Sequence, residues 1–435
     1  MVLIGRASSM EIQQKHIPQL RFPEFLNDGE WEVKRLGEIA ESFTGLTYSP
    51  EQVVENGGTL VLRSSNIKNG VLSFEDNVYV QMDIPERAIT HIGDLLICVR
   101  NGSKNLIGKS AVITKEAENT AFGAFMTVLR AKEGTDQEFL NFLWQSDMIQ
   151  NQILRNLGST INQITSKDLN GYKVIVPPLA EQRRIAACLS ALDEMLAATN
   201  EKLEQMKAYK KGLMQQLFVD SMGGGGKSLK INHLQIPKLR FPEFYEEKEW
   251  IYYNGDKMFE PIVNKNHNSD LPVLAITQDQ GAIPRDLIDY NVIVSDKSIE
   301  AYKVVEIGDF IISLRSFQGG IEYSKFKGLC SPAYIVLRKK SDDVCDDFYR
   351  YYFKSNQYIK DLNRNLEGIR DGKMVSYKQF SDIMIPCPKY EEQWKIASCL
   401  SAMDETINAY TEKVGLLGQY KKGLMQQMFP QNQMN

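Results

Sequence analysis

The sequence predicts an α+β fold: two tandem domains of mixed but β-rich content, each followed by a long α-helix, with the two helices forming an antiparallel coiled coil. Three observations support this prediction. The octapeptide Tyr-Lys-Lys-Gly-Leu-Met-Gln-Gln occurs at 209–216 and again at 420–427. Around each copy, apolar residues recur at alternating steps of four and three, which is the heptad spacing of a coiled coil. Upstream, short apolar runs alternate with turns rich in Gly, Asn and Asp, as expected for β-strands.

The start of each repeat is marked by the motif Leu-Arg-Phe-Pro-Glu-Phe, at 20–25 and 239–244, with Trp31 and Trp250 behind it. The copies are 219 positions apart there, 215 apart at Ile-Gly-Asp (92–94 and 307–309), and 211 apart in the long helices. A repeat of this length indicates two domains rather than a solenoid. Because the ends are similar and the middles differ, we expect a common scaffold that carries two different recognition surfaces.

The domain boundaries follow from these motifs. We expect a leader at 1–17, a first domain at 18–179, a first long helix at 180–218, a Gly-rich linker at 219–236, a second domain at 237–389, a second long helix at 390–429 and a tail at 430–435. Expected strands lie at 59–62, 71–74, 94–99, 111–114 and 126–129, and at 273–276, 291–294, 309–314 and 334–337. A helical stretch follows in each domain, at 137–157 and 346–366.

The two long helices carry matching apolar stripes. A stripe of about 40 residues is roughly 58 Å long at 1.5 Å per residue, which favours a helix pair over the alternative of a core helix packed on its own domain. Each stripe contains one lysine, Lys210 or Lys421, which would set the register at some cost in stability. The positions predicted to pack helix on helix are Leu189, Leu192, Leu196, Leu203, Leu213 and Leu217, and Leu400, Met403, Ile407, Val414, Leu417 and Leu424.

Composition narrows the protein class. With 435 residues and 43% apolar content, the chain is long enough for two or three domains, and no apolar run approaches the roughly 18 residues of a membrane span. The start lacks the pattern of a signal peptide, and six cysteines without a Cys-x-x-Cys pair read as reduced thiols, so we expect a cytoplasmic protein. The net charge of −4 argues against a protein that coats nucleic acid but leaves room for a locally basic cleft.

The sequence contains partial matches to catalytic motifs, but each match lacks a residue that the motif requires. Gly-Lys-Ser at 108–110 and 226–228 lacks the first glycine of a phosphate-binding loop, since Ser103 and Ser221 stand there. Pro177-Pro178 lacks the flanking residues of an amino-methyltransferase motif, and the four histidines are not spaced for zinc. We therefore expect no catalytic residue, no metal site and no cofactor in this chain.

Loops dense in hydrogen-bond donors are the candidate sites. Arg, Asn, Gln and Ser side chains read base edges and hold phosphates, although a polar loop is also explained by solvation alone. Arg100 and Arg315 follow equivalent expected strands, which favours recognition at those two positions. The candidate DNA-binding residues are Arg63, Ser64, Asn66, Lys68, Arg100, Asn101, Lys104, Ser159, Thr160 and Asn162 in the first domain, and Thr277, Gln278, Gln280, Arg315, Ser316, Gln318, Arg370 and Lys373 in the second.

Taken together and in this order, the motifs resemble the specificity subunit of type I restriction-modification systems. The resemblance runs from Pro18 to Phe429 and is most specific in the Pro-Pro-Leu-Ala-Glu-Gln run that ends at Gln182. The second copy of that run departs to Pro-Lys-Tyr-Glu-Glu-Gln at 388–393, and Glu-Gly-Ile at 367–369 replaces the Gly-Ser-Thr of 158–160.

The resemblance implies two target-recognition domains, each reading one half of a split DNA sequence, with the paired helices as a ruler between them. It also implies docking of two methyltransferase subunits, with two restriction-translocase subunits joining for cleavage. S-adenosylmethionine, ATP and magnesium would belong to those partners, and this chain would not be catalytic. The alternatives are a coiled-coil scaffold with two protein-binding domains, and an enzyme that acts alone.

Overall fold

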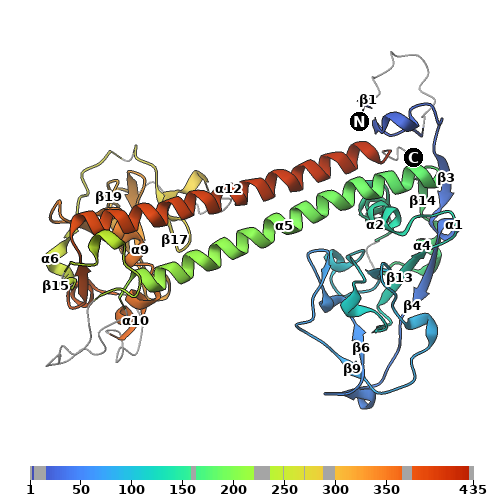
Figure 1. Cartoon of the computed structure of the whole chain (residues 1–435), viewed down its shortest axis with the longest axis horizontal. Coiled ribbons are helices and arrows are strands. Elements are labelled where there is room, and N and C mark those ends of the chain that lie inside the picture. The colour runs from blue at the N-terminus through green and yellow to red at the C-terminus, as the bar shows by residue number, and fades with distance from the viewer. Residues whose placement is uncertain are drawn as a thin grey trace. The chain divides into compact units, whose positions relative to one another are not determined.

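The computed structural model describes residues 2–3, 16–157, 163–219, 236–247, 249–268, 270–287, 299–364 and 375–430. The chain forms two compact units. Unit 1 comprises Met1–Thr199 and Glu412–Asn435, and unit 2 comprises Asn200–Thr411. Each unit therefore contains one recognition domain, the first part of the long helix that follows it, and the last part of the other long helix (Figure 1).

Two four-stranded sheets form the body of unit 1. The first has the order β11-β10-β13-β4 and is antiparallel throughout; the second has the order β12-β6-β9-β5. The strands of these sheets are β4 (Ala40–Thr44), β5 (Val53–Val54), β6 (Thr59–Leu62), β9 (Tyr79–Val80), β10 (Leu95–Cys98), β11 (Ser110–Val112), β12 (Ala121–Phe122) and β13 (Met126–Ala131). Three strand pairs complete the unit: β1 (Val2–Leu3) with β2 (Leu20–Arg21), β3 (Glu32–Arg35) with β14 (Lys173–Val176), and β7 (Ile67–Lys68) with β8 (Val71–Leu72).

The helices of unit 1 are α1 (Leu36–Ile39), α2 (Gln137–Gln145), α3 (Asp147–Asn156) and α4 (Ser166–Gly171). The single helical stretch expected at 137–157 is wrong in one respect, because it is broken at Ser146. Ser146 has extended backbone angles, and its hydroxyl donates to the Leu143 carbonyl oxygen at 2.6 Å. Before the break, α2 buries Phe139, Leu143 and Trp144 in the core of the unit.

The described residues of unit 2 form one four-stranded sheet, in the order β16-β23-β20-β21, and three strand pairs. The sheet strands are β16 (Phe259–Ile262), β20 (Phe310–Ile312), β21 (Glu322–Tyr323) and β23 (Ile335–Lys339). The pairs are β15 (Ile251–Asn254) with β24 (Met384–Cys387), β17 (Leu274–Thr277) with β18 (Gly281–Pro284), and β19 (Lys303–Val305) with β22 (Gly328–Cys330). The strand expected at 291–294 lies outside the described residues.

In the described part of unit 2 the helices of the recognition domain are α6 (Gly255–Met258), α8 (Ser316–Gly319), α9 (Asp346–Tyr352), α10 (Asn356–Arg364) and α11 (Tyr377–Ser381). The single helical stretch expected at 346–366 is therefore wrong in the same respect as that of unit 1, because a turn at 353–355 separates α9 from α10. The core of unit 2 is aromatic where that of unit 1 is mainly aliphatic. Phe310 meets Phe259 and Phe353 edge to face, with ring centroids 5.4 and 5.2 Å apart. Such pairs add about 0.5–1.5 kcal/mol each beyond the burial of their surface, so two differently composed cores support the same plan.

The repeated motifs have structural roles in both units. The guanidinium of Arg21 donates twice to the Glu181 carboxylate at 2.8 Å, and Arg240 donates twice to Glu392 at 2.7 Å. All four side chains are at most 5% exposed. These two pairs, which we call the buried braces, tie the opening motif of each repeat to the start of its long helix.

The Ile-Gly-Asp motif also has a structural role in both units. Its aspartate accepts two hydrogen bonds from an arginine of a central strand: Asp94 from Arg130, and Asp309 from Arg338.

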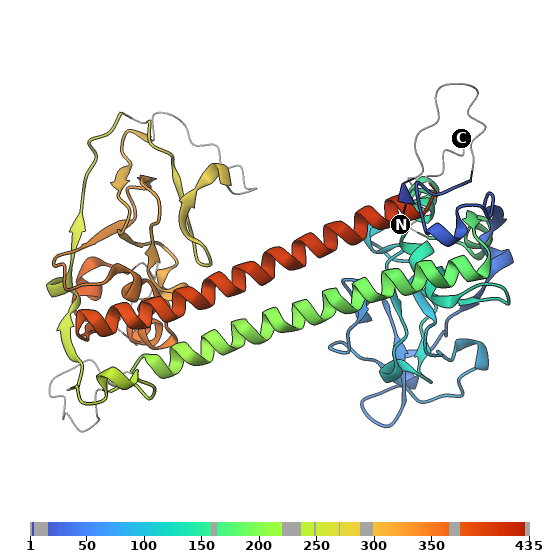
Figure 2. The same ribbon diagram turned by 45° about the horizontal axis from the view of Figure 1, so that its top comes forward.

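The long helices are α5 (Leu179–Leu217) and α12 (Tyr390–Met428), as the heptad pattern predicts. In unit 1, Leu189 of α5 shares a core with Leu424 of α12, and in unit 2 Leu400 of α12 shares a core with Leu217 of α5. Within each unit, one helix start therefore meets the other helix end, which confirms the antiparallel pairing (Figure 1, Figure 2). Of the predicted packing residues, Leu189, Leu203, Leu217, Leu400 and Leu424 are buried and Leu192, Leu196, Leu213, Met403, Ile407, Val414 and Leu417 are half-buried.

The lysine in each stripe is paired rather than left alone. In unit 1, Lys421 Nζ lies 2.6 Å from the Asp193 carboxylate and 5.1 Å from the centre of the Phe142 ring. In unit 2, Lys210 pairs with Asp404 and lies 4.9 Å from the centre of the Tyr351 ring. Each lysine thus links the two helices and the recognition domain of its own unit.

Candidate nucleic-acid interface

In unit 1 the structure brings the expected recognition loops together. Asn101 Nδ2 donates to the Ser64 hydroxyl at 3.1 Å, which joins the loop after β10 to the loop after β6. Arg100 forms a β-bridge with Gln163, at the edge of the third expected loop. Residues from three separate segments, at Ser64, Arg100-Asn101 and Gln163, therefore meet at one place in unit 1.

Arg100 is the best-placed cation of this site. Arg100 is exposed, and its guanidinium lies 5.1 Å from the centre of the Phe125 ring. Phe125 is also exposed, at 55%. Within the described ranges no carboxylate pairs with it. A guanidinium held against an aromatic face and open to solvent is suited to a phosphate or to the edge of a guanine.

Neighbouring candidates are already engaged. Arg63 pairs with Asp76 at 3.0 Å, and Lys68 pairs with Glu75. The DNA-reading role expected for Asn66 is wrong, because this residue is fully buried. Its side-chain oxygen accepts from the Arg63 backbone N–H at 2.9 Å, and its amide nitrogen donates to the Ser73 carbonyl at 3.0 Å. Asn66 therefore shapes the loop that presents Ser64.

In unit 2 the two described loops also meet. Gln278 Nε2 donates to the Arg315 carbonyl oxygen at 3.4 Å, while Thr277 Oγ1 closes its own turn by donating to the Gly281 carbonyl at 3.0 Å. Gln278, Gln280, Arg315 and Gln318 are exposed. The reading role expected for Ser316 is wrong: this residue is 1% exposed, begins α8, and accepts from the Ser313 backbone N–H at 2.8 Å.

Lys354, which the sequence analysis missed, holds these loops in place. Its Nζ donates to the Gln278 carbonyl at 3.0 Å and to the Gly319 carbonyl at 2.9 Å, and it pairs with the buried Glu322 carboxylate. Burial raises the pKa of Glu322 to about 7, against the opposing effect of Lys354, and burial lowers the pKa of Lys354. The sequence did contain a clue to Lys354, because the equivalent position in the first repeat is the uncharged Gln145.

The remaining candidates divide into two groups. Lys104 is exposed in the loop after β10. Ser159, Thr160, Asn162, Arg370 and Lys373 lie outside the described residues. In the described parts of the chain, no three His, Cys, Asp or Glu side chains gather as metal ligands.

Two stretches of the chain, 28–208 and 243–415, match the family described as the type I restriction modification DNA specificity domain. The chain belongs to this family. Its members confer DNA target specificity on restriction-modification complexes and are not themselves catalytic. The chain thus has a DNA-recognition role with two recognition domains, and it assembles with other subunits of such a complex. No helix in the described ranges combines the length and apolar content needed to cross a membrane.

Relatives extend over nearly the whole chain. A protein of Methanocaldococcus jannaschii, assigned by name to a type I restriction enzyme MjaX as its specificity subunit, is 27% identical over 412 residues, covering 91% of this chain and 92% of that protein. The type I restriction enzyme EcoKI specificity subunit of Escherichia coli is 23% identical over 390 residues, covering 84% of this chain and 80% of its own.

Solved structures share the fold. The S subunit of a type I restriction-modification system from M. genitalium superposes with a TM-score of 0.56 at 15% identity, covering 96% of this chain and all of that one. A chain from a study of complex assembly and conformational transition of the type I R-M system superposes with a TM-score of 0.52 at 20% identity, covering 92% and 97%.

Proposed function

We propose that each unit reads one half of a bipartite DNA target and that α5 and α12 set the number of unread base pairs between the halves. The main support for this proposal is that the buried scaffold residues are repeated in both units, whereas the exposed loops differ. The buried braces recur with the same residue types, whereas Arg-Asn-Gly at 100–102 is replaced by Arg-Ser-Phe at 315–317. One scaffold with two loop chemistries supports two different half-sites.

The length of the helices supports a ruler. Each helix has 39 residues without interruption. At 1.5 Å per residue such a helix is about 58 Å long, which corresponds to roughly one and a half to two turns of B-DNA at about 34–36 Å per turn.

We propose that the repeated octapeptide docks two identical methyltransferase subunits. Tyr209 and Tyr420 are 61% and 59% exposed. Seven positions further on, on the same helix face, Gln216 is exposed and Gln427 is half-buried. Folding does not require identical side chains at exposed positions, so their repetition supports two copies of one partner.

The same assignment extends to the full complex. We propose that two restriction-translocase subunits join it for cleavage, that S-adenosylmethionine, ATP and magnesium are bound by the partners, and that the complex works in the cytoplasm. Support comes from the incomplete catalytic motifs of this chain and from its family.

The ruler is tested by shortening both helices together. Deleting 200–206 and 408–414 removes one heptad from each helix while keeping the Lys421–Asp193 and Lys210–Asp404 pairs on either side. A heptad is about 10.5 Å of helix, or about three base pairs of B-DNA. We expect methylated sites with a spacer shorter by about three base pairs, or loss of methylation, when methylated adenines are mapped in cells that also express the partner subunits.

The matched control replaces the same two heptads by other heptads of equal length, and it should leave the spacer unchanged. Methylation by the shortened chain at the original spacing would contradict the ruler.

A further inference from the structure

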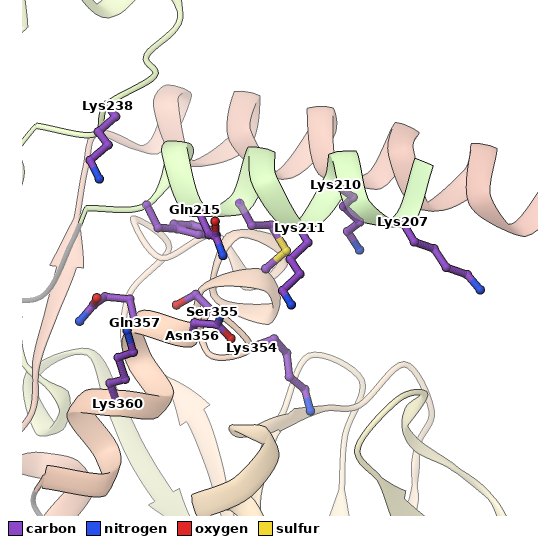
Figure 3. Close-up of a pocket in the computed structure, with 12 residues that line it drawn as sticks. Lys207, Lys210, Lys211, Gln215, Lys238, Lys354, Ser355, Asn356, Gln357 and Lys360 are labelled. Atoms are coloured by element: carbon purple, nitrogen blue, oxygen red, sulfur yellow. The ribbon is translucent and has the colours of Figure 1, made fainter. Parts of the chain in front are cut away.

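Unit 2 contains a lysine pocket that no recognition loop accounts for. Its volume is about 330 Å³, and it lies between the C-terminal part of α5 and the turn that joins α9 to α10 (Figure 3). The lysines that line it are Lys207, Lys210, Lys211, Lys238, Lys354 and Lys360. The other lining residues are polar or apolar, and none is acidic.

The charge of the pocket is not fully compensated. Lys210, Lys354 and Lys207 pair with Asp404, Glu322 and Glu204, respectively. In contrast, Lys211 and Lys360 pair with no carboxylate in the part of the chain that the structure describes. Figure 3 shows Lys211 extending from α5 toward Ser355 and Asn356, with Lys360 on the opposite wall. Two ammonium groups therefore face one polar pocket from different elements, an arrangement suited to an anion.

Unit 1 shows that the scaffold does not need these charges. Only two of the six lysines have a lysine at the equivalent position of unit 1. Lys210 and Lys211 correspond to Lys421 and Lys422. The other four, Lys207, Lys238, Lys354 and Lys360, correspond to Gly418, Gln19, Gln145 and Asn151. Unit 1 pairs the same helices around Lys421 and Asp193 without the other four charges. Of the added lysines, Lys354 pairs with Glu322 and Lys207 with Glu204. Lys360 has no such carboxylate partner in the described residues, so a ligand accounts for it better than folding does.

The pocket borders the candidate reading loops of unit 2. Lys354 lines the pocket and also holds the carbonyl groups of Gln278 and Gly319, one from each loop. Hence a DNA strand whose bases meet these loops would pass its backbone close to the lysines. Contacts to phosphates position a protein on DNA without reading sequence.

We propose that the lysine pocket binds a phosphate group of the DNA backbone beside the half-site read by unit 2. This inference rests on the proposed function. Lys211 and Lys360 supply the charge, and Lys354 fixes the distance between the bound phosphate and the reading loops. The two half-sites are then held unequally, because Lys211 has a counterpart in unit 1, Lys422, whereas Lys360 is replaced there by Asn151.

The experiment measures DNA binding by the complex of the full chain with its methyltransferase partner across a range of salt concentrations. For Lys360→Gln we expect about a tenfold loss of affinity near 100 mM salt, and a slope of log affinity against log salt smaller by about one. The loss should be equal on target and non-target duplexes, and the methylated sequence should not change. The control Lys378→Gln removes an exposed lysine of unit 2 outside the pocket and should alter neither quantity.

A backbone scan locates the phosphate. Single linkages of the target duplex are replaced by neutral methylphosphonates, and one linkage beside the second half-site should weaken binding of the unmodified complex but not that of Lys360→Gln. An unchanged salt slope, or weaker subunit assembly with normal DNA binding, would overturn the proposal in favour of a protein contact. If the unmodified complex does not prefer its target duplex, the proposed function itself fails, which is a separate result.

Discussion

Units 1 and 2 are built on the same scaffold and present different surfaces. Both contain a buried brace, an aspartate–arginine pair in the central sheet, and a lysine–aspartate link between the long helices. They differ at the loops, where unit 1 joins Asn101 to Ser64 and unit 2 joins Gln278 to the Arg315 backbone. Residues that are buried and repeated in both units therefore serve folding, whereas exposed residues that differ between the units are the candidates for recognition.

The largest effect should come from breaking the part that the units share. Removing the carboxylate in Glu181→Ala or Glu392→Ala leaves a buried arginine unpaired, which costs about 3–5 kcal/mol. The Glu181 change should cost more, since Trp31 Nε1 also donates to that carboxylate at 3.2 Å. Scanning calorimetry of the full chain should show a lower unfolding temperature for the unit that carries the change.

The control for the braces is Glu24→Ala. Glu24 pairs with Arg184 at 3.2 Å, but both side chains are about half exposed, and exposed pairs contribute about 0–1 kcal/mol. If the brace variants lose no more stability than this control, the assignment of the repeated motifs to folding is wrong.

A smaller effect should separate the two reading surfaces. Arg100→Ala should relax the first half-site alone, and Arg315→Ala the second alone, because each arginine belongs to the loops of its own unit. A lost base or phosphate contact costs about 1–3 kcal/mol, or roughly ten- to hundredfold in affinity. Selection of bound sequences from a duplex library randomised in both half-sites measures this, with the exposed Arg87→Ala as control. Equal loss at both half-sites would refute the division of labour.

The smallest effect concerns Glu322, which has no ionisable counterpart in unit 1. Glu322 lies opposite Ile311 in the sheet, and the equivalent pair in unit 1 is Leu96 with Ala111. Its pKa is raised to about 7 in the folded chain. The folded state therefore binds more protons than the unfolded state between the ordinary pKa and about 7. The associated stability is present at low pH and is lost as the pH rises through 7. The slope contributed by this one group is at most about 1.4 kcal/mol per pH unit.

Glu322→Gln should remove this contribution. Urea unfolding of the full chain at pH 5 to 7.5 should then show a flatter dependence of unit 2 stability on pH, with unit 1 unaffected. An unchanged slope would mean that Glu322 keeps its ordinary pKa in the folded chain.

The duplication, the two long helices and some of the strands, such as β6, β10 and β13, could be predicted from the sequence alone, whereas β3, β4, β14 and β16 were not expected. The helices expected at 180–218 and 390–429 are Leu179–Leu217 and Tyr390–Met428, and the strand expected at 59–62 is β6. The helices and strands depend on local periodicity and on turn residues, which are visible within a window of about ten to twenty positions.

Only the tertiary structure decided which polar residues are available to a ligand. Asn66 and Ser316 have the side chains of readers, yet both are buried and bonded to backbone groups. Lys354, by contrast, joins two loops that lie 35 and 76 positions away in the sequence. Burial and such long-range hydrogen bonds depend on neighbours that the chain brings together only on folding, so composition and spacing could not reveal them.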